Sequence, residues 1–237
     1  MDLKTLQPEI RHLKDMAEVL YDPSLAQTKP DLELYQMYRD LAENESDRQK
    51  MVKQELRYDI TVLNPVILGE EFNKTAGHDH PLAPNTDMTY PELYQVLKGQ
   101  VIFLLQDSVD DKIQDIYTIE VQQDDIVIIP PNYEHIMINA SEQKAETANW
   151  ITSRFSENIY ESFRIKHGFG YYALKGQTNQ INWVKNEHYL KTPQLKSKRP
   201  NIRVDEFKIP KQKPIYQLIN HSAKLNFLKR PQDYDWS

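Results

Sequence analysis

Residues 74–99 read KTAGHDHPLAPNTDMTYPELYQVLKG, and residues 128–139 read IIPPNYEHIMIN. Each stretch joins a run of strand-forming residues to histidine and to turn residues such as the Pro130-Pro131 pair. Residues two apart on a strand point to the same face, so His78 and His80 can reach one point in space. The two stretches therefore predict a β-rich fold in which histidines approach a common site.

Short β-rich runs separated by turn residues extend from Tyr58 to about Trp150. They are YDITVLNP (58–65), ELYQVL (92–97), QVIFLLQ (100–106), IYTIEV (116–121), DIVIIPP (125–131) and HIMIN (135–139). Lys98-Gly99 lies between two of these runs and predicts a tight hairpin. This texture is typical of an antiparallel β-sandwich or β-barrel.

The chain on the N-terminal side of this region has a different texture. Apolar residues between positions 5 and 22 recur at spacings of three and four, which predicts one amphipathic helix. The segment LELYQMYRDLA (32–42) fits a helix or a strand, and its pattern alone does not decide between them. The polar stretch 43–55 is expected to be a loop or a solvated helix.

On the C-terminal side, HGFGYYALKG (167–176) and QINWV (180–184) are expected to be strands. The segment from Lys191 onward is rich in Lys and Pro and has little apolar periodicity, so it is expected to wrap the surface or to reach a partner subunit. We therefore expect a single domain in three parts: an N-terminal helix and strand extension (1–56), a barrel (57–190) and a tail (191–237).

Composition excludes several classes of function. The 237 residues include no cysteine, which excludes disulfides, thiolate metal sites and thiol nucleophiles and favours a cytoplasmic protein. The 6 glycines all fall between Gly69 and Gly176, which excludes a Gly-rich phosphate loop and a dinucleotide-binding turn. A net charge of −6 with interleaved signs argues against nucleic-acid binding. No apolar run approaches the roughly 18 residues of a membrane span, and the first residues lack the apolar stretch of a secretory signal.

Three histidines and one carboxylate form the candidate site for chemistry. Glu92 opens the run that follows His78 and His80, and His135 lies on the run that ends at Asn139. These four side chains suit an octahedral divalent metal with two positions left for water or substrate. An HxH pair alone is often a surface accident, but the spacing of Glu92, His135 and the nearby turn residues favours a metal site.

This spacing resembles that of the cupin superfamily, whose first motif is HxH followed by Glu and Gly and whose second contains Gly, Pro-x-Gly, His and Asn. Glu92 and Gly99 match the first motif, and the second is in register, although Asp124 and Asn132 stand where the superfamily has glycine. Asp and Asn tolerate positive φ best after glycine. The resemblance implies a mainly β, jelly-roll barrel or sandwich, here with an N-terminal helical segment and an extended C-terminal tail.

A narrower resemblance, from Tyr58 to Gly168, is to the cupin-type glucose-6-phosphate isomerases, which interconvert glucose 6-phosphate and fructose 6-phosphate. It rests on TVLNP (61–65), KTAGHDH (74–80), PELYQVLKG (91–99), FLLQ (103–106) and IIPPNYEHIMIN (128–139). It implies one divalent metal ion, Fe²⁺ first with Mn²⁺, Ni²⁺ or Zn²⁺ as alternatives. The implied metal ligands are His78, His80, Glu92 and His135.

The same resemblance implies a sugar-phosphate ligand and a homodimer. The implied catalytic residues are Glu92, Tyr94 and Tyr160. The implied phosphate or substrate contacts are Thr61, Thr75, Gly77 and Tyr35. Tyr35 is included among these contacts because LYQMY (34–38) is similar to an early strand of the family. The same similarity favours a strand for that ambiguous segment.

The chain departs from the family pattern in two places. The gap between His80 and Glu92 is longer than in short members, which predicts a longer loop over the mouth of the site. Near the substrate the family has a Tyr, then a His and a second Tyr. This chain has Thr152 or Ser153 and Asn158 in place of the first two, and only the second Tyr is kept, as Tyr160. The family residues give the substrate phosphate no Lys or Arg partner. In this chain the candidates for such a partner are Lys74 and Arg154.

These residues predict a metal-dependent aldose–ketose isomerase. Glu92 is the carboxylate that the motif places at the reacting carbons, either as a base in an enediol route or as a ligand alone in a hydride shift. Two alternatives stay open: a cupin oxygenase or decarboxylase with the same metal site, and a non-catalytic cupin that binds a sugar phosphate.

Overall fold

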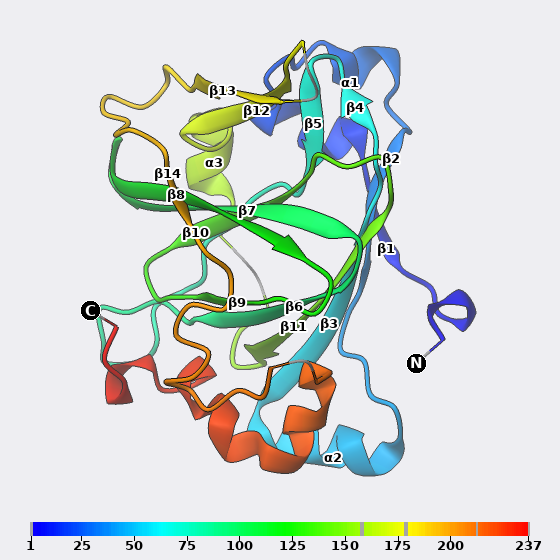
Figure 1. Ribbon diagram of the computed structural model, residues 1–237, viewed down its shortest axis with the longest axis vertical. Coiled ribbons are helices and arrows are strands. Elements are labelled where there is room, and N and C mark those ends of the chain that lie inside the picture. Colours follow the sequence, from blue (N-terminus) through cyan, green and yellow to red (C-terminus); the bar gives the residue numbers. More distant parts are fainter. Residues whose placement is uncertain (1, 157–158, 178–179, 212, 237) are drawn as a thin grey trace.

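The computed structural model describes residues 2–156, 159–177, 180–211 and 213–236 (Figure 1). Two β-sheets curl toward each other and enclose the interior of an open barrel (Figure 1). The first sheet has the order β1-β2-β3-β11-β6-β9. Its strands are β1 (Glu9–His12), β2 (Glu33–Tyr38), β3 (Leu56–Leu63), β11 (Ala145–Thr152), β6 (Glu92–Lys98) and β9 (Ile126–Ile129).

The second sheet has the order β13-β12-β5-β10-β7-β8-β14, with β4 beside β5. Its strands are β4 (Ile67–Leu68), β5 (Glu71–Lys74), β7 (Gln100–Val109), β8 (Lys112–Gln122), β10 (Glu134–Asn139), β12 (Tyr171–Lys175), β13 (Ile181–Lys185) and β14 (Lys196–Lys198). Every run expected to be a strand is one, and the mainly β, cupin-like fold is confirmed.

The predicted hairpin at Lys98-Gly99 is wrong. β6 pairs with β11 and β9, whereas β7 pairs with β10 and β8, so the turn carries the chain from one sheet to the other. Gly99 has φ +75°, and a Cβ there would lie 2.9 Å from the Lys144 carbonyl oxygen. Glycine therefore permits a sharp corner between the sheets.

Asp124 and Asn132 adopt the left-handed conformation expected of their motif, with φ of +73° and +65°. Asn132 also fixes the segment before β6, because its backbone N–H donates to Thr89 Oγ1 and its side chain accepts from the Thr89 N–H. The replacements thus keep the backbone shape that glycine gives in related motifs, and they add side-chain contacts.

The helix predicted for residues 5–22 is wrong. Residues Glu9–His12 form β1, which pairs with the edge of β2, and the apolar residues that follow lie on a 3-10 helix, Leu13–Val19. Leu13, Met16 and Val19 are buried there at the three-residue spacing of that helix. Strand pairing with β2 overrides the local helical pattern.

The two other N-terminal segments agree with one of their alternatives. The ambiguous segment 32–42 contains β2, and the polar stretch forms α2 (Glu45–Gln54). The Asn44 side chain accepts the Asp47 N–H at 2.9 Å and caps that helix. Two short helices, α1 (Leu25–Thr28) and α3 (Glu161–Ile165), lie near the β5–β12 end (Figure 1).

The C-terminal segment first crosses the outside of the barrel, where β14 pairs in parallel with β8. It then buries a second apolar core against β3, β6 and β11, built on the 3-10 segment Ile215–Leu228, which its weak periodicity did not indicate. Trp150 Nε1 donates to the Ile215 carbonyl oxygen at 2.7 Å. The tail is therefore packed structure, while the boundaries proposed at 56/57 and 190/191 stay predictions.

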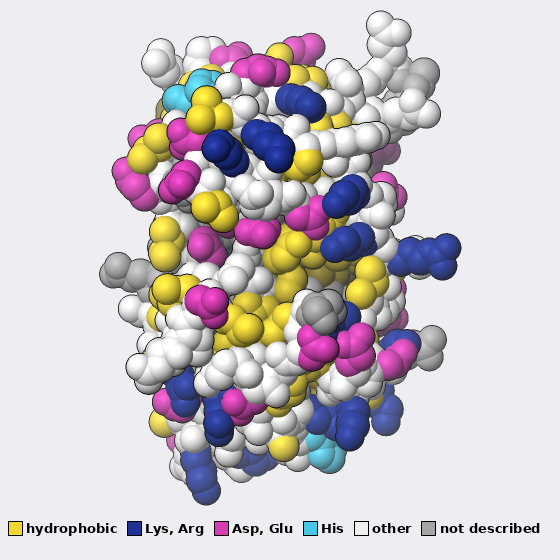
Figure 2. Space-filling model, turned by 90° about the vertical axis from the view of Figure 1, so that its left-hand side faces the viewer, with side chains coloured by type: hydrophobic (Ala, Val, Ile, Leu, Met, Phe, Trp, Pro, Cys, Tyr) yellow, Lys and Arg dark blue, Asp and Glu magenta, His cyan; other side chains and the backbone are white. Residues whose placement is uncertain are grey.

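Apolar side chains gather in the middle of the face that carries β8 and the C-terminal segment, with charged side chains around them (Figure 2). A hollow between β8, β9 and residues 201–206 is lined by Tyr117, Ile128, Pro130, Ile202 and Trp236. None of the described helices is long and apolar enough to cross a membrane.

Candidate metal centre

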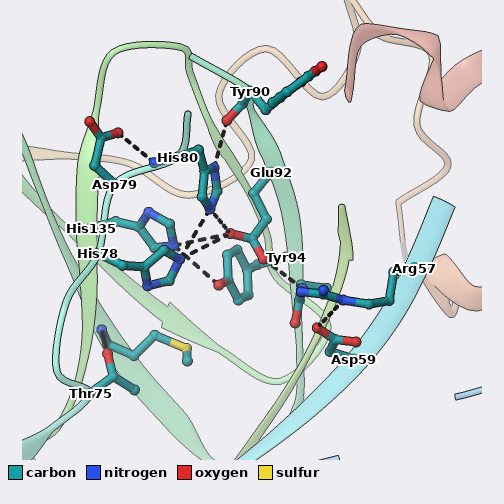
Figure 3. A network of polar contacts seen from close by, with 12 residues as sticks. Arg57, Asp59, Thr75, His78, Asp79, His80, Tyr90, Glu92, Tyr94 and His135 are labelled. Carbon is teal, nitrogen blue, oxygen red and sulfur yellow. Dashed lines mark hydrogen bonds and ion pairs between the residues drawn. The ribbon is translucent and has the colours of Figure 1, made fainter. Parts of the chain in front are cut away.

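Strands from both sheets bring the four predicted ligands together. His78 and His80 follow β5, and the His135 N–H donates to the His78 carbonyl, which holds this segment against β10. Glu92 begins β6 in the opposite sheet. The three imidazoles and the carboxylate point toward one another inside the barrel (Figure 3).

The ligating atoms have the spacing that a metal ion needs. Glu92 Oε2 lies 3.2 Å from His135 Nε2, 3.3 Å from His80 Nε2 and 3.8 Å from His78 Nε2. The His78 and His80 Nε2 atoms are 3.1 Å apart. Ligands at right angles around a metal, each about 2.1 Å from it, lie roughly 3 Å apart. The cluster could therefore hold one divalent ion.

A buried carboxylate oxygen without a donor supports this interpretation. His80, Glu92 and His135 are each 2% exposed, and Glu92 Oε2 has no hydrogen-bond partner. An ionised oxygen taken out of water is costly unless a cation or donor meets it. The donor set of three imidazoles and one carboxylate fits a first-row divalent metal.

The protonation states of His78 and Glu92 suit a metal, whereas for His80 burial is outweighed by the contact with Glu92, which raises the pKa of that imidazole. Burial lowers the pKa of His78 to about 3, so that its imidazole is neutral. Burial alone would raise the pKa of Glu92, but contacts with His135, His78 and His80 outweigh it and lower the pKa well below the usual range. Neutral imidazole and ionised carboxylate are the forms that bind divalent cations.

Groups around the cluster fix its orientation. The Tyr90 carbonyl oxygen lies 2.6 Å from His80 Nδ1 and accepts a hydrogen bond from the Nδ1–H, which leaves Nε2 as the ligating atom. Asn149 Nδ2 donates to Glu92 Oε1 at 2.6 Å. The Phe155 ring covers His80, with centroids 5.2 Å apart. The long loop between His80 and Glu92 thus contacts the cluster, through the hydrogen bond between the Tyr90 carbonyl and His80.

The predicted substrate residues line one cavity with His78, Glu92 and His135. They are Tyr35, Thr61, Thr75, Gly77, Tyr94 and Tyr160. The Tyr94 hydroxyl lies 3.2 Å from His135 Nε2, and burial raises the pKa of that hydroxyl well above its usual value. The Tyr160 and His78 ring centroids are 6.2 Å apart. The cavity brings these side chains together, and their roles stay predictions.

Gly77 and Tyr35 help to shape the wall of the cavity. Gly77 has φ +79°, and a Cβ there would lie 2.5 Å from the Phe169 ring and 2.7 Å from Ile136 Cγ2. The Tyr35 hydroxyl accepts the Ala76 N–H at 3.3 Å. The turn at 75–77 is therefore held between β10 and β2.

Neither candidate cation from the sequence reaches the cavity. Lys74 is buried and pairs with Glu71 at 2.5 Å, and Arg154 pairs with Glu55 at 2.7 Å. Thr152 is buried and donates to the Glu55 carbonyl oxygen, whereas Asn158 lies outside the described residues.

Sequence reasoning missed Arg39, Arg57, Asp59 and Asn149, which line the same cavity. Asp59 lies 2.9 Å from Arg57 and 3.5 Å from Arg39, on the side of Tyr94 away from His78 (Figure 3). The alternation of β3 could have revealed part of this group, because residues 57 and 59 share a face with Thr61. Asn149 had no such signal, since β11 was not identified as a strand.

A family model described as glucose-6-phosphate isomerase matches residues 10–192, more than three quarters of the chain. The chain belongs to this family of cupin-type glucose-6-phosphate isomerases. No curated protein matches this isomerase-family chain.

Solved structures similar to this family member are other cupins. An oxalate decarboxylase from Lactobacillus farciminis, in a formate complex, is 14% identical over 67% of this chain and 34% of its own, with a TM-score of 0.42. A recombinant oxalate oxidase in complex with glycolate is 14% identical over 54% of this chain and 55% of its own, with a TM-score of 0.40. A vicilin from Corylus avellana is 13% identical over 68% of this chain and 35% of its own, with a TM-score of 0.41. The chain spans about half the length of the oxalate oxidases.

Proposed function

We propose that this chain is a metal-dependent isomerase that interconverts glucose 6-phosphate and fructose 6-phosphate. One observation carries the proposal: metal-type ligands and the family's phosphate-side residues line a single cavity. An oxygenase or decarboxylase would have no use for the phosphate-side residues Thr61, Thr75 and Gly77. The family match supports the same activity.

Each side chain then has a task. A divalent ion bound by His78, His80, Glu92 and His135 supplies Lewis-acid stabilisation of negative charge on the sugar oxygens O1 and O2. Hydroxyl and amide groups of Thr61, Thr75 and Gly77 bind the phosphate, which orients C1 and C2 near Glu92.

Two routes for the hydrogen are compatible with Glu92. In an enediol route Glu92 removes a proton from one carbon and returns it to the other, within hydrogen-bond reach of both. In a hydride shift Glu92 is a ligand alone. Asn149 holds the Oε1 oxygen in either case, and the buried walls exclude water.

We further propose Fe²⁺ as the native metal, with Mn²⁺, Ni²⁺ or Zn²⁺ as alternatives, because imidazole and carboxylate ligands suit all four. A cytoplasmic location and a homodimer stay predictions.

Metal resupply tests the activity. A metal-stripped sample is reloaded with Fe²⁺ or Mn²⁺ and assayed for conversion of fructose 6-phosphate to glucose 6-phosphate, with a Glu92→Ala variant as control. We expect turnover that returns with metal in the wild-type protein alone. Turnover no greater than that of the control would reject the proposal.

A further inference from the structure

A sugar phosphate brings a dianion into the cavity, but the phosphate contacts inferred from the family resemblance are all uncharged. Thr61, Thr75 and Gly77 offer hydroxyl and backbone donors only. Charge-assisted hydrogen bonds are shorter and about twice as strong as neutral ones. A cation at this end of the cavity is therefore the missing part of the site.

Arg11 is in the right place to supply it. In the register of β1 and β2, Arg11 lies directly opposite Tyr35, so their side chains share the face that looks into the barrel. The Arg11 guanidinium lies beside the Tyr35 hydroxyl, and that hydroxyl accepts the Ala76 N–H. Ala76 is the residue between Thr75 and Gly77, so the Tyr35 hydroxyl links Arg11 to the turn that carries the phosphate-side residues.

The guanidinium of Arg11 also lacks the partner that neighbouring arginines have. Its Nε is buried with no hydrogen-bond partner, and among the described residues no carboxylate lies within the 4.0 Å of an ion pair. The nearby arginines are all paired: Arg39 with Glu9 and Asp59, Arg57 with Asp59, and Arg164 with Glu18. A buried donor left unpaired is costly, and an anionic ligand would satisfy it.

A second, smaller cavity adjoins the main one, and Arg11, Ala76 and Tyr160 line it together with the carboxylates of Asp15 and Glu18. Ala76 and Tyr160 line both cavities, so they form the wall between them. Arg11 thus lies in the neighbouring cavity, on the other side of the wall that Ala76 and Tyr160 form.

We propose that Arg11 is the cationic residue that binds the phosphate group of the substrate. The proposal rests on the proposed isomerase function for the identity of the ligand, while the anion site itself stands on the geometry of β1, β2 and residues 75–77. It makes the N-terminal strand part of the active site. It also sets the direction of the sugar: the phosphate lies toward β1, and C1 and C2 lie toward His78 and Glu92.

The test is Arg11→Met, which keeps an apolar stem and removes the charge, compared with Arg11→Lys and with Arg48→Met on α2. Arg48 pairs with Asp40 at 2.5 Å and is away from the cavity. Binding of inorganic phosphate and of fructose 6-phosphate to the metal-loaded protein is measured by calorimetry. KM, kcat, metal content and Tm are measured in parallel, and Arg11→Gln is used if Arg11→Met does not fold.

We expect Arg11→Met to weaken phosphate binding and to raise KM by about 10- to 100-fold, as for a lost charge-assisted bond. Metal content should not change, kcat should change less than KM, and Arg11→Lys should recover part of the loss. Phosphate affinity equal to that of Arg48→Met would overturn the proposal, as would a loss confined to kcat, which indicates only that Arg11 supports Tyr35. Phosphate binding needs no turnover, so an inactive wild-type protein that binds phosphate through Arg11 would reject the isomerase function alone.

Discussion

Asn149 Nδ2 donates a 2.6 Å hydrogen bond to Oε1 of Glu92, which leaves Oε2 of the same carboxylate facing the three imidazoles. The two residues sit on adjacent strands, where Asn149 lies opposite Tyr94, two residues after Glu92. One amide thus divides the carboxylate into an oxygen that is held by the protein and an oxygen that faces the metal cluster.

Asn149→Ala should therefore weaken the metal site without removing a ligand. We expect metal affinity or kcat to fall by about 10- to 100-fold, because partners behind a ligating residue commonly contribute that much. Chelator competition measures the affinity. Asn182→Ala, at an exposed position of β13, is the matched control. Equal affinities in the two variants would show that the Asn149 contact does not orient Glu92.

His135→Ala should lose the metal while the chain stays folded. His135 contributes one of four converging atoms and lies on a strand whose pairing with β7 does not depend on its side chain. Elemental analysis gives the metal content and circular dichroism gives the fold, with His188→Ala as control. Full metal stoichiometry in His135→Ala would refute its assignment as a ligand.

Removal of the metal should lower Tm, because Glu92 Oε2 is then buried beside three imidazoles with no cation to meet it. A ligand present at about 100 times its Kd stabilises by about 2.7 kcal/mol, which corresponds to roughly 5–10 °C for a chain of this size. Calorimetry with and without chelator measures the shift. His135→Ala should show none, and an equal shift in that variant would mean that the chelator acts elsewhere.

Phe227→Ala should destabilise the whole fold. Phe227 is fully buried in the second apolar core, and truncation of a buried Phe costs about 3–5 kcal/mol. Denaturant unfolding measures this loss, and Val52→Ala, 70% exposed on α2, is the control. Unfolding free energies that agree between the two variants would mean that the C-terminal segment is not part of the cooperative fold.

Much of the barrel and the cluster of three histidines with Glu92 could be predicted, because alternating runs and the HxH, Glu and His spacing are local signals. The N-terminal strand could not, since the stability of Glu9–His12 comes from pairing with β2, a partner remote in the sequence. β11 was missed because Ala, Glu and Asn, which are depleted in strands, occupy its first part, and the position of Asn149 was therefore missed too.

The cationic side of the cavity could not be predicted for the same reason. Lys74 is close to the phosphate-side residues in sequence, yet its side chain turns to Glu71. Arg39 and Arg57 reach the cavity, and Arg11 reaches its neighbour, through strand pairing, which no short motif encodes. The second core was missed because its residues pack through a 3-10 segment with a kink at His221.

The central claim is that this site interconverts the two sugar phosphates. Fructose 6-phosphate and glucose 6-phosphate are incubated separately with the metal-loaded protein in the absence of oxygen, and both mixtures are followed by ¹³C NMR. We expect both to reach the same mixture of the two sugars, and neither to react with Glu92→Ala. No interconversion in either direction, or a product that forms only when oxygen is admitted, would contradict the central claim.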